Sequence, residues 1–147
     1  MGVYVDQQES KTEAIITPVA ICEAIEMTDD MVIPKIYRTM NCMWDTGSTN
    51  TLITQEVVKE LGLTPYSKAI ISDNTTVEEC DTYMVHLGLP TGNTVLGLEV
   101  MLSNSKDYDV VIGMDVITLG DFVLTNANGK SVFSFRYPAI ENIVLKS

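Results

Sequence analysis

The stretch Met40-Asn41-Cys42-Met43-Trp44-Asp45-Thr46-Gly47-Ser48 decides how the rest of this chain is interpreted. The mostly apolar residues 40–44 predict a strand, and residues 54–61 predict a short helix beyond the turn. An aspartate on a tight Thr-Gly turn at a strand end suits a carboxylate that meets a second carboxylate. Thr46 can anchor the loop by hydrogen bonds, and Gly47 lets backbone approach backbone closely. Most turn aspartates only cap their own loop, so this interpretation depends on a second motif.

The second motif is Tyr108-Asp109-Val110-Val111-Ile112-Gly113-Met114-Asp115-Val116-Ile117. An apolar strand runs into Gly113, and a short helix is predicted to begin with Asp115 near its N-cap. Together the two motifs resemble the retropepsin-like aspartic proteases, which include retroviral, retroelement and bacterial single-domain members. The resemblance covers about residues 14 to 137. It implies that the strand ending in Val111, Ile112 and Gly113 threads the Asp45 loop.

The resemblance also implies a mechanism, in which Asp45 is one half of a catalytic dyad. The chemistry needs two carboxyl groups about 3 Å apart that share one proton, because like charges at that distance cannot both ionise. The ionised group activates a water molecule, and the protonated group hydrogen-bonds the developing oxyanion. No metal or cofactor is needed. The chain has one Asp-Thr-Gly, whereas the site needs two such aspartates. We therefore predict a symmetric homodimer with both copies of Asp45 at the two-fold axis.

Three further loop residues take roles from the resemblance. Thr46 would hydrogen-bond across the axis, and Gly47 would contact the substrate backbone. The Ser48 hydroxyl can hydrogen-bond the ionised Asp45 and favour its charged form, which shifts the dyad toward acid operation. Many retroviral enzymes carry an Asp–Arg ion pair where this chain has Thr49 and Met114. Both partners are missing together, which places the chain nearer the retroelement and bacterial branch.

A hairpin with a polar tip is predicted from residues 68–71 and 78–89, and the resemblance makes it the flap that covers the substrate. The candidate flap and substrate-binding residues are Ile71, Ser72, Asp73, Asn74, Thr75 and Val77. Met43, Ile71 and Val77 are candidates for the side-chain pockets. Family flaps are usually rich in glycine, whereas residues 70–77 contain none, although Asn74 can adopt a positive φ.

The composition favours one domain with a substantial core, since 147 residues include 46% hydrophobic ones. We predict a flexible N-terminal arm over residues 1–13 and a single retropepsin-like domain over residues 14–147. A net charge of -11 argues against nucleic acid or an anionic membrane surface as the main partner. Three scattered cysteines without a Cys-x-x-Cys pair make a zinc site unlikely and indicate buried thiols in a reducing compartment. The sequence lacks a transmembrane-length apolar run and signal-peptide features, which predicts a soluble, cytoplasmic protein.

Many short strands and two short helices predict an all-β, closed barrel-like fold. Pro18 is expected to interrupt its strand or to place it at a sheet edge. The expected strands are 14–26, 32–44, 52–53, 68–71, 78–89, 94–102, 109–112, 122–125 and 131–137, with helices over 54–61 and 116–122. The last two strands form a hairpin around Asn128-Gly129. The apolar tail, residues 140–145, is a candidate for strand pairing between two copies.

Three functions remain open from the sequence. The first is a homodimeric endopeptidase that cleaves extended peptides, preferentially between apolar residues. The second is a catalytically silent protease-like module that dimerises or binds peptides. The absence of glycine from the predicted flap supports this alternative. The third is an unrelated small β-barrel binding protein whose motifs are coincidental.

Overall fold

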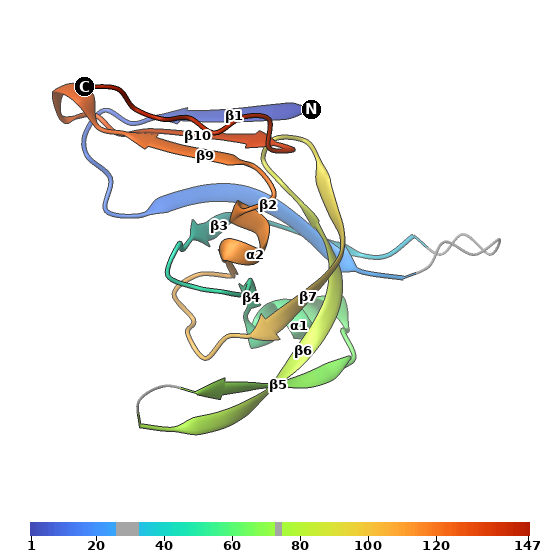
Figure 1. Cartoon of the computed structure of the whole chain (residues 1–147). Coiled ribbons are helices and arrows are strands. Elements are labelled where there is room, and N and C mark those ends of the chain that lie inside the picture. The colour runs from blue at the N-terminus through green and yellow to red at the C-terminus, as the bar shows by residue number, and fades with distance from the viewer. Residues whose placement is uncertain (26–32, 73–74) are drawn as a thin grey trace.

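The computed structural model describes residues 1–25, 33–72 and 75–147 (Figure 1). Its strands are β1 (Gly2–Gln7), β2 (Ile15–Glu23), β3 (Ile36–Trp44), β4 (Leu52–Ile53), β5 (Ser67–Ser72), β6 (Val77–Gly88), β7 (Thr94–Leu102), β8 (Val110–Ile112), β9 (Asp121–Thr125) and β10 (Val132–Tyr137). Its helices are α1 (Gln55–Leu61), α2 (Met114–Ile117) and a 3-10 turn, η1 (Ala127–Gly129). The predicted all-β class with two short α-helices is therefore confirmed.

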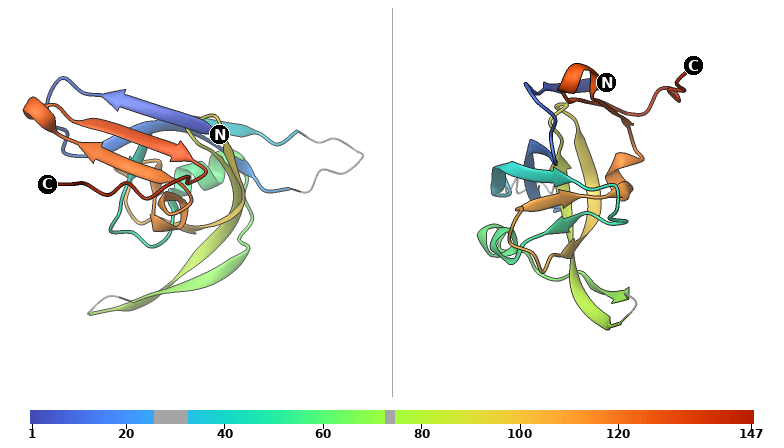
Figure 2. Two further views of the ribbon diagram at one scale, coloured as in Figure 1. Left: turned by 45° about the horizontal axis from the view of Figure 1, so that its top comes forward. Right: turned by 90° about the vertical axis from the view of Figure 1, so that its left-hand side faces the viewer.

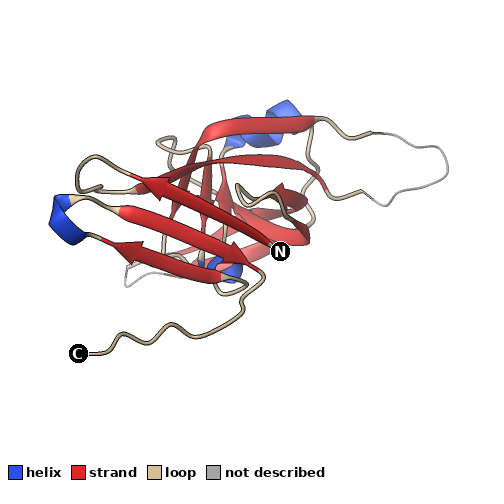
Figure 3. Ribbon diagram, turned by 90° about the horizontal axis from the view of Figure 1, so that it is seen from above, coloured by secondary structure: helices blue, strands red, loops and turns tan. Residues whose placement is uncertain are grey.

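The strands form two sheets. Seven of them pair in the order β2-β3-β8-β4-β7-β6-β5, and β2 also pairs with β6, so the ring of pairings returns to β2. The other sheet has the order β1-β10-β9 and lies as a separate layer above β2 and β3 (Figures 1 and 2), so it is nearest the viewer when the molecule is seen from above (Figure 3). Pro18 interrupts the ladder as predicted, since the register of β2 with β3 shifts between Thr17 and Val19, but β2 is not an edge strand, because it pairs with β6 from Ala20 onward.

A β-bulge in β3 decides which side chains of that strand face the core. Met40 and Asn41 of β3 together oppose Pro18 of β2, so β3 carries one extra residue there. The extra residue reverses the parity of the side chains. Even-numbered residues are exposed up to Met40, whereas those beyond it, ending in Trp44, are buried. Asp45 therefore leaves the strand directly after a buried tryptophan and is itself half-buried.

The buried Trp44 ties the end of β3 to the three-stranded sheet. Its ring centroid lies 4.7 Å from that of Phe135 and 5.3 Å from that of Phe133, in tilted geometry. Such aromatic pairs contribute about 0.5–1.5 kcal/mol each beyond their burial. The indole Nε1 donates a 2.8 Å hydrogen bond to the hydroxyl of Thr17, so its polar atom is also satisfied. The strand that ends at Asp45 is thus fixed from both sheets.

The N-terminal residues do not form the flexible arm that their polar composition predicts. Residues 2–7 are β1, which pairs along its whole length with β10 in antiparallel register. Tyr4 turns inward and packs on Phe133, with ring centroids 6.4 Å apart. The prediction was wrong because the partner strand lies about 130 residues later, where no local pattern reports it.

The two helices differ in how well local signals predict them. Thr54 caps α1 by accepting a hydrogen bond from the Val57 amide, and Gly62 ends it with φ 64°, as predicted. The second helix was expected over residues 116–122 but is α2, with Gly113 at its N-cap. The predicted end was wrong because Phe122 belongs to β9, where it pairs with Phe135.

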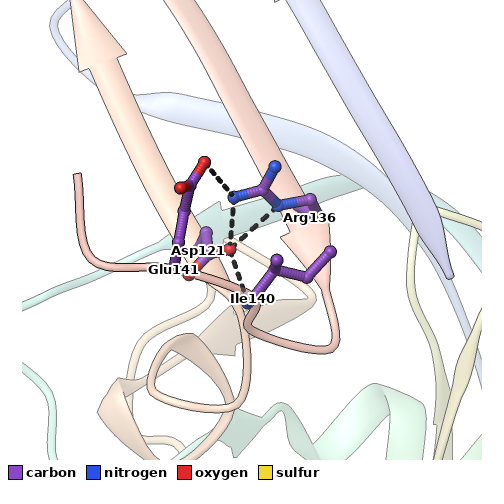
Figure 4. Close-up of polar contacts among 4 residues, drawn as sticks. All are labelled: Asp121, Arg136, Ile140 and Glu141. Atoms are coloured by element: carbon purple, nitrogen blue, oxygen red, sulfur yellow. Dashed lines mark hydrogen bonds and ion pairs between the residues drawn. The ribbon is translucent and has the colours of Figure 1, made fainter.

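Asp121 fastens the start of the C-terminal segment (Figure 4). Its Oδ2 accepts hydrogen bonds from Arg136 Nε at 2.9 Å and from the Ile140 amide at 2.8 Å. These donors, led by the Ile140 amide and the Arg136 side chain, hold the pKa of Asp121 below its ordinary value. The tail beyond Glu141 has no regular secondary structure in this protomer, and Leu145 is 91% exposed.

The three cysteines are free thiols. Cys42 is buried, and burial raises the pKa of its thiol, whereas Cys22 and Cys80 are half-buried. Among the described residues no His, Cys, Asp and Glu side chains gather in a group of three that could hold a metal ion. Over the same residues, no helix has the length and apolar character needed to span a membrane.

Candidate active site

The Asp45 loop is fixed by its own backbone and by β8. The Asp45 amide donates a 2.8 Å hydrogen bond to the carbonyl of Ile112, and the Ser48 amide donates to the carbonyl of Asp45 at 3.1 Å. The Gly47 amide donates to Asp45 Oδ1 at 2.8 Å, which orients the carboxylate. Asp45 Oδ2 accepts no hydrogen bond from the residues that the structure describes, so one carboxylate oxygen is available.

The strand expected to thread the loop lies beside it. β8 runs parallel to β3, with Val111 opposite Met43 and Ile112 opposite Trp44. At Gly113 an added Cβ would lie 2.5 Å from the carbonyl oxygen of Asn50 and 2.8 Å from that of Ser48. Both contacts are with backbone, which cannot rotate away. Glycine is therefore required where the threading strand passes the loop.

Thr51 and Asp115 clamp the far end of the loop, a contact that sequence reasoning missed. The fully buried Thr51 hydroxyl donates to Asp115 Oδ1 at 2.7 Å and accepts from the Gly113 amide at 3.2 Å. The Thr51 amide donates to Asp115 Oδ2 at 2.9 Å. The expected N-cap role of Asp115 is thus wrong, because its carboxylate joins α2 to the start of β4.

Ser48 supports the loop differently from the prediction. Its hydroxyl donates to the carbonyl of Asn50 at 2.7 Å, and its carbonyl accepts from the Met114 amide at 2.7 Å. A hydroxyl has a single proton to donate, so the predicted hydrogen bond from Ser48 to Asp45 is wrong in this protomer. Ser48 holds the shape of the turn, and Gly47 provides the hydrogen bond to the carboxylate.

The loop and the β5–β6 hairpin line one cleft of about 390 Å³. Its lining residues are Gly47, Ser48, Thr49, Asn50, Leu52, Ile70, Ile71 and Met101. Of the predicted pocket residues, Ile71 lies here, whereas Met43 and Val77 do not line this cleft. Leu52 and Met101 were missed, and their meeting depends on the parallel pairing of β4 with β7.

The remaining predicted flap residues are only partly placed. Ser72 ends β5 opposite Val77 at the start of β6, so the predicted hairpin is present. Thr75 precedes β6 and is exposed. Asp73 and Asn74, the predicted tip, lie outside the described residues.

Thr46 faces a second cavity, away from the flap cleft. This cavity of about 300 Å³ is also lined by Ile15, Trp44, Phe122 and Leu124. Thr46 is exposed, and Leu124 of the edge strand β9 is 41% exposed. The predicted cross-axis residue is therefore accessible beside an apolar surface.

Comparisons with known proteins agree with this geometry. A family model described as "Aspartyl protease" matches residues 37–116, which include the Asp45 motif and the second motif as far as Val116. The solved structure of a retropepsin-like aspartic protease from Rickettsia conorii is similar, with a TM-score of 0.53 and 10% identity, over 92% of this chain and 94% of that chain. The retroviral protease-like domain of Ddi1 from Leishmania major matches with a TM-score of 0.44 and 14% identity, over 84% and 95%. No curated protein sequence matches the chain. The chain therefore belongs to the aspartyl protease family and has a retropepsin-like fold.

Proposed function

We propose that this protein is an endopeptidase in which two copies of Asp45 activate a water molecule on the two-fold axis of a homodimer. The observation that carries the proposal is the single Asp45 carboxylate, with Oδ1 fixed by the Gly47 amide and Oδ2 available. One such carboxylate per chain gives half of a two-carboxylate site. A second copy supplies the other half.

The chemistry follows from the shared proton. The ionised carboxylate accepts a proton from water as the water oxygen attacks the peptide carbonyl. The protonated carboxyl donates a hydrogen bond to the carbonyl oxygen as negative charge develops there. When the carbon–nitrogen bond breaks, a carboxyl group returns a proton to the leaving amine. The fixed loop keeps the two carboxylates in position, so little reorganisation accompanies the reaction.

The cleft supports an extended peptide with apolar side chains as substrate. Leu52, Ile70, Ile71 and Met101 supply apolar walls beside the loop. Ile70 is 70% exposed in the free protomer, which leaves apolar area for a substrate to cover. Asn50 adds an amide at the polar side of the cleft.

The dimer would form against electrostatic repulsion. Each copy carries a net charge of -11, so the contact is expected to be apolar or made by strand pairing, and to tighten as salt screens the charge. The β9 edge and the exposed apolar tail, residues 143–145, are the candidate surfaces. We propose one domain that includes β1, because β1 shares a sheet with β10. The three free cysteines favour a reducing compartment such as the cytoplasm.

The alternative is a silent peptide-binding or dimerisation module. The absence of glycine between residues 70 and 77 favours it, since a stiff flap hinders closure over a substrate. An endopeptidase cleaves peptides, whereas a silent module binds them without cleavage, so a cleavage assay distinguishes the two functions.

The test is digestion of a diverse peptide library by the purified protein across acid to neutral pH. We expect cleavage between apolar residues, inhibition by a statine-type mimic of the tetrahedral intermediate, and no cleavage by Asp45→Asn. Thermal unfolding of Asp45→Asn serves as the control for folding. Peptide binding without any cleavage by the wild-type dimer would select the silent module.

A further inference from the structure

A groove lies on the outer face of β2, β3 and β6, away from the Asp45 loop. It encloses about 570 Å³ and includes Pro18, Ala20, Ile36, Arg38, Met40 and Leu89 in its lining. Asp45 is not among the lining residues. Arg38 precedes Asp45 by seven residues on the same strand, which at about 3.3 Å per residue separates them by roughly 20 Å. The groove is therefore a different surface from the catalytic cleft.

The floor of the groove is low because two small residues meet there. Ala20 of β2 pairs with Gly88 of β6 on one side and with Arg38 of β3 on the other. An added Cβ at Gly88 would lie 3.3 Å from the carbonyl oxygen of Ala20, so the two backbones pack closely. The absence of larger side chains at these two positions hollows the face of the sheet.

The walls expose apolar surface next to one cation. Ile36 is 47% exposed and Met40 is 75% exposed, and both belong to the exposed even-numbered side chains that precede the β3 bulge. Arg38 stands between them on the same face and is the one charged residue in the lining. Among the described residues the Arg38 side chain forms no ion pair or hydrogen bond. In a chain with 20 acidic and 9 basic residues, an arginine without a carboxylate partner is available to an external one.

We propose that this groove docks an extended peptide segment of a partner protein that presents a carboxylate side chain beside an aliphatic one. The carboxylate pairs with the planar guanidinium of Arg38, and the aliphatic side chain covers Ile36 and Met40. Thr94 also lines the groove and provides a polar group for the peptide backbone. The site works without Asp45, so it does not depend on the proposed catalysis.

The experiment maps binding on the ¹⁵N-labelled Asp45→Asn protein, which prevents cleavage of the probe. The probe is an N-acetylated, C-amidated octapeptide of alternating leucine and glutamate. We expect amide shift changes at residues 19–20, 36–40, 88–89 and 91–94, which omits Pro18 and Pro90 because proline has no amide proton. Arg38→Gln should weaken binding at least fivefold, and Ala20→Met should weaken it by filling the floor. Lys130→Gln, which removes an exposed cation elsewhere, should leave the affinity unchanged.

Three results would overturn the proposal. The first is a set of shift changes confined to the Asp45 loop and β5–β6, and the second is an affinity that Arg38→Gln leaves unchanged. The third is binding of decanoate, which has a carboxylate and an aliphatic chain but no peptide backbone, without binding of the peptide. The Arg38 side chain is exposed and has no polar partner among the described residues, so Arg38→Gln is expected to fold and decides the matter if Ala20→Met does not fold. Because binding is measured in the inactive variant, a failure here leaves the endopeptidase proposal untouched. Likewise, a protein without protease activity can still pass this test.

Discussion

Replacing Thr51 by valine tests whether the contact between Thr51 and Asp115 holds the Asp45 loop in place. Valine keeps the shape of threonine but removes a fully buried hydroxyl. The Gly113 amide then loses its acceptor at 3.2 Å, and Asp115 Oδ1 loses a donor at 2.7 Å. Asp115 keeps the backbone amides of Thr51 and Val116 as donors, so its loss is moderate.

The expected destabilisation follows from these two losses. An unsatisfied buried N–H costs about 1–3 kcal/mol, and the lost hydrogen bond to a carboxylate adds about 1 kcal/mol or more. The total of about 2–4 kcal/mol corresponds to a fall in Tm of roughly 5–15 °C for a chain of this size. Peptide cleavage should fall as well, because Gly113 passes directly beside the Asp45 loop.

The assay is thermal unfolding followed by circular dichroism, with Thr51→Ser as the matched control. Serine keeps the hydroxyl and loses one methyl group, so it should cost about 1 kcal/mol. The reasoning is refuted if Thr51→Val is as stable as Thr51→Ser. In that case the buried hydroxyl would contribute no more than its methyl group.

Three further predictions concern other parts of the protein. Gly113→Ala should lower the Tm by several degrees more than Gly88→Ala. The Cβ added at Gly113 meets two backbone carbonyl groups, whereas the Cβ added at Gly88 meets one carbonyl oxygen at 3.3 Å. Equal Tm values for the two variants would contradict this. Ser48→Ala should lower stability by about 1 kcal/mol and leave the pH–activity profile in place, since the hydroxyl bonds a carbonyl; a shifted profile would restore its predicted role. Folding lowers the pKa of Asp121 from its ordinary value of 3.8, so the ionised carboxylate stabilises the fold at pH values above 3.8. This stabilisation is lost as the pH falls through the pKa that Asp121 has in the folded protein. The stability difference between wild type and Asp121→Asn should therefore shrink in unfolding curves below about pH 4; a constant difference would show that the ionised form is not favoured.

Local signals predicted the elements whose determinants lie within a few residues. The threonine cap and left-handed glycine of α1 are examples, with Gly62 at φ 64°. The hairpin of β9 and β10 is another, because Asn128 and Gly129 adopt the positive φ values that the turn needs. In these cases the neighbouring residues carry the whole physical cause.

Features that depend on distant partners were missed or wrong. β1 exists because β10 pairs with it, and neither local polarity nor spacing reports that partner. The contact between Thr51 and Asp115 joins residues 64 positions apart. From the sequence, the Ser48 hydroxyl could donate to the nearby Asp45 carboxylate or to the nearby Asn50 carbonyl, and the folded loop shows that it donates to Asn50. The placement of the Asp45 loop against residues 111–113, in contrast, was predicted because both motifs were visible together.

The central claim is that one active site needs Asp45 from two chains, and subunit mixing tests it most directly. Wild type and Asp45→Asn are mixed in equal amounts at constant total concentration, allowed to exchange, and assayed for peptide cleavage. Random pairing leaves about a quarter of the dimers with two wild-type chains, so we predict about a quarter of the pure wild-type activity. A mixture that keeps about half of the activity, in proportion to the wild-type chain alone, would show that each chain cuts by itself and would contradict the shared dyad.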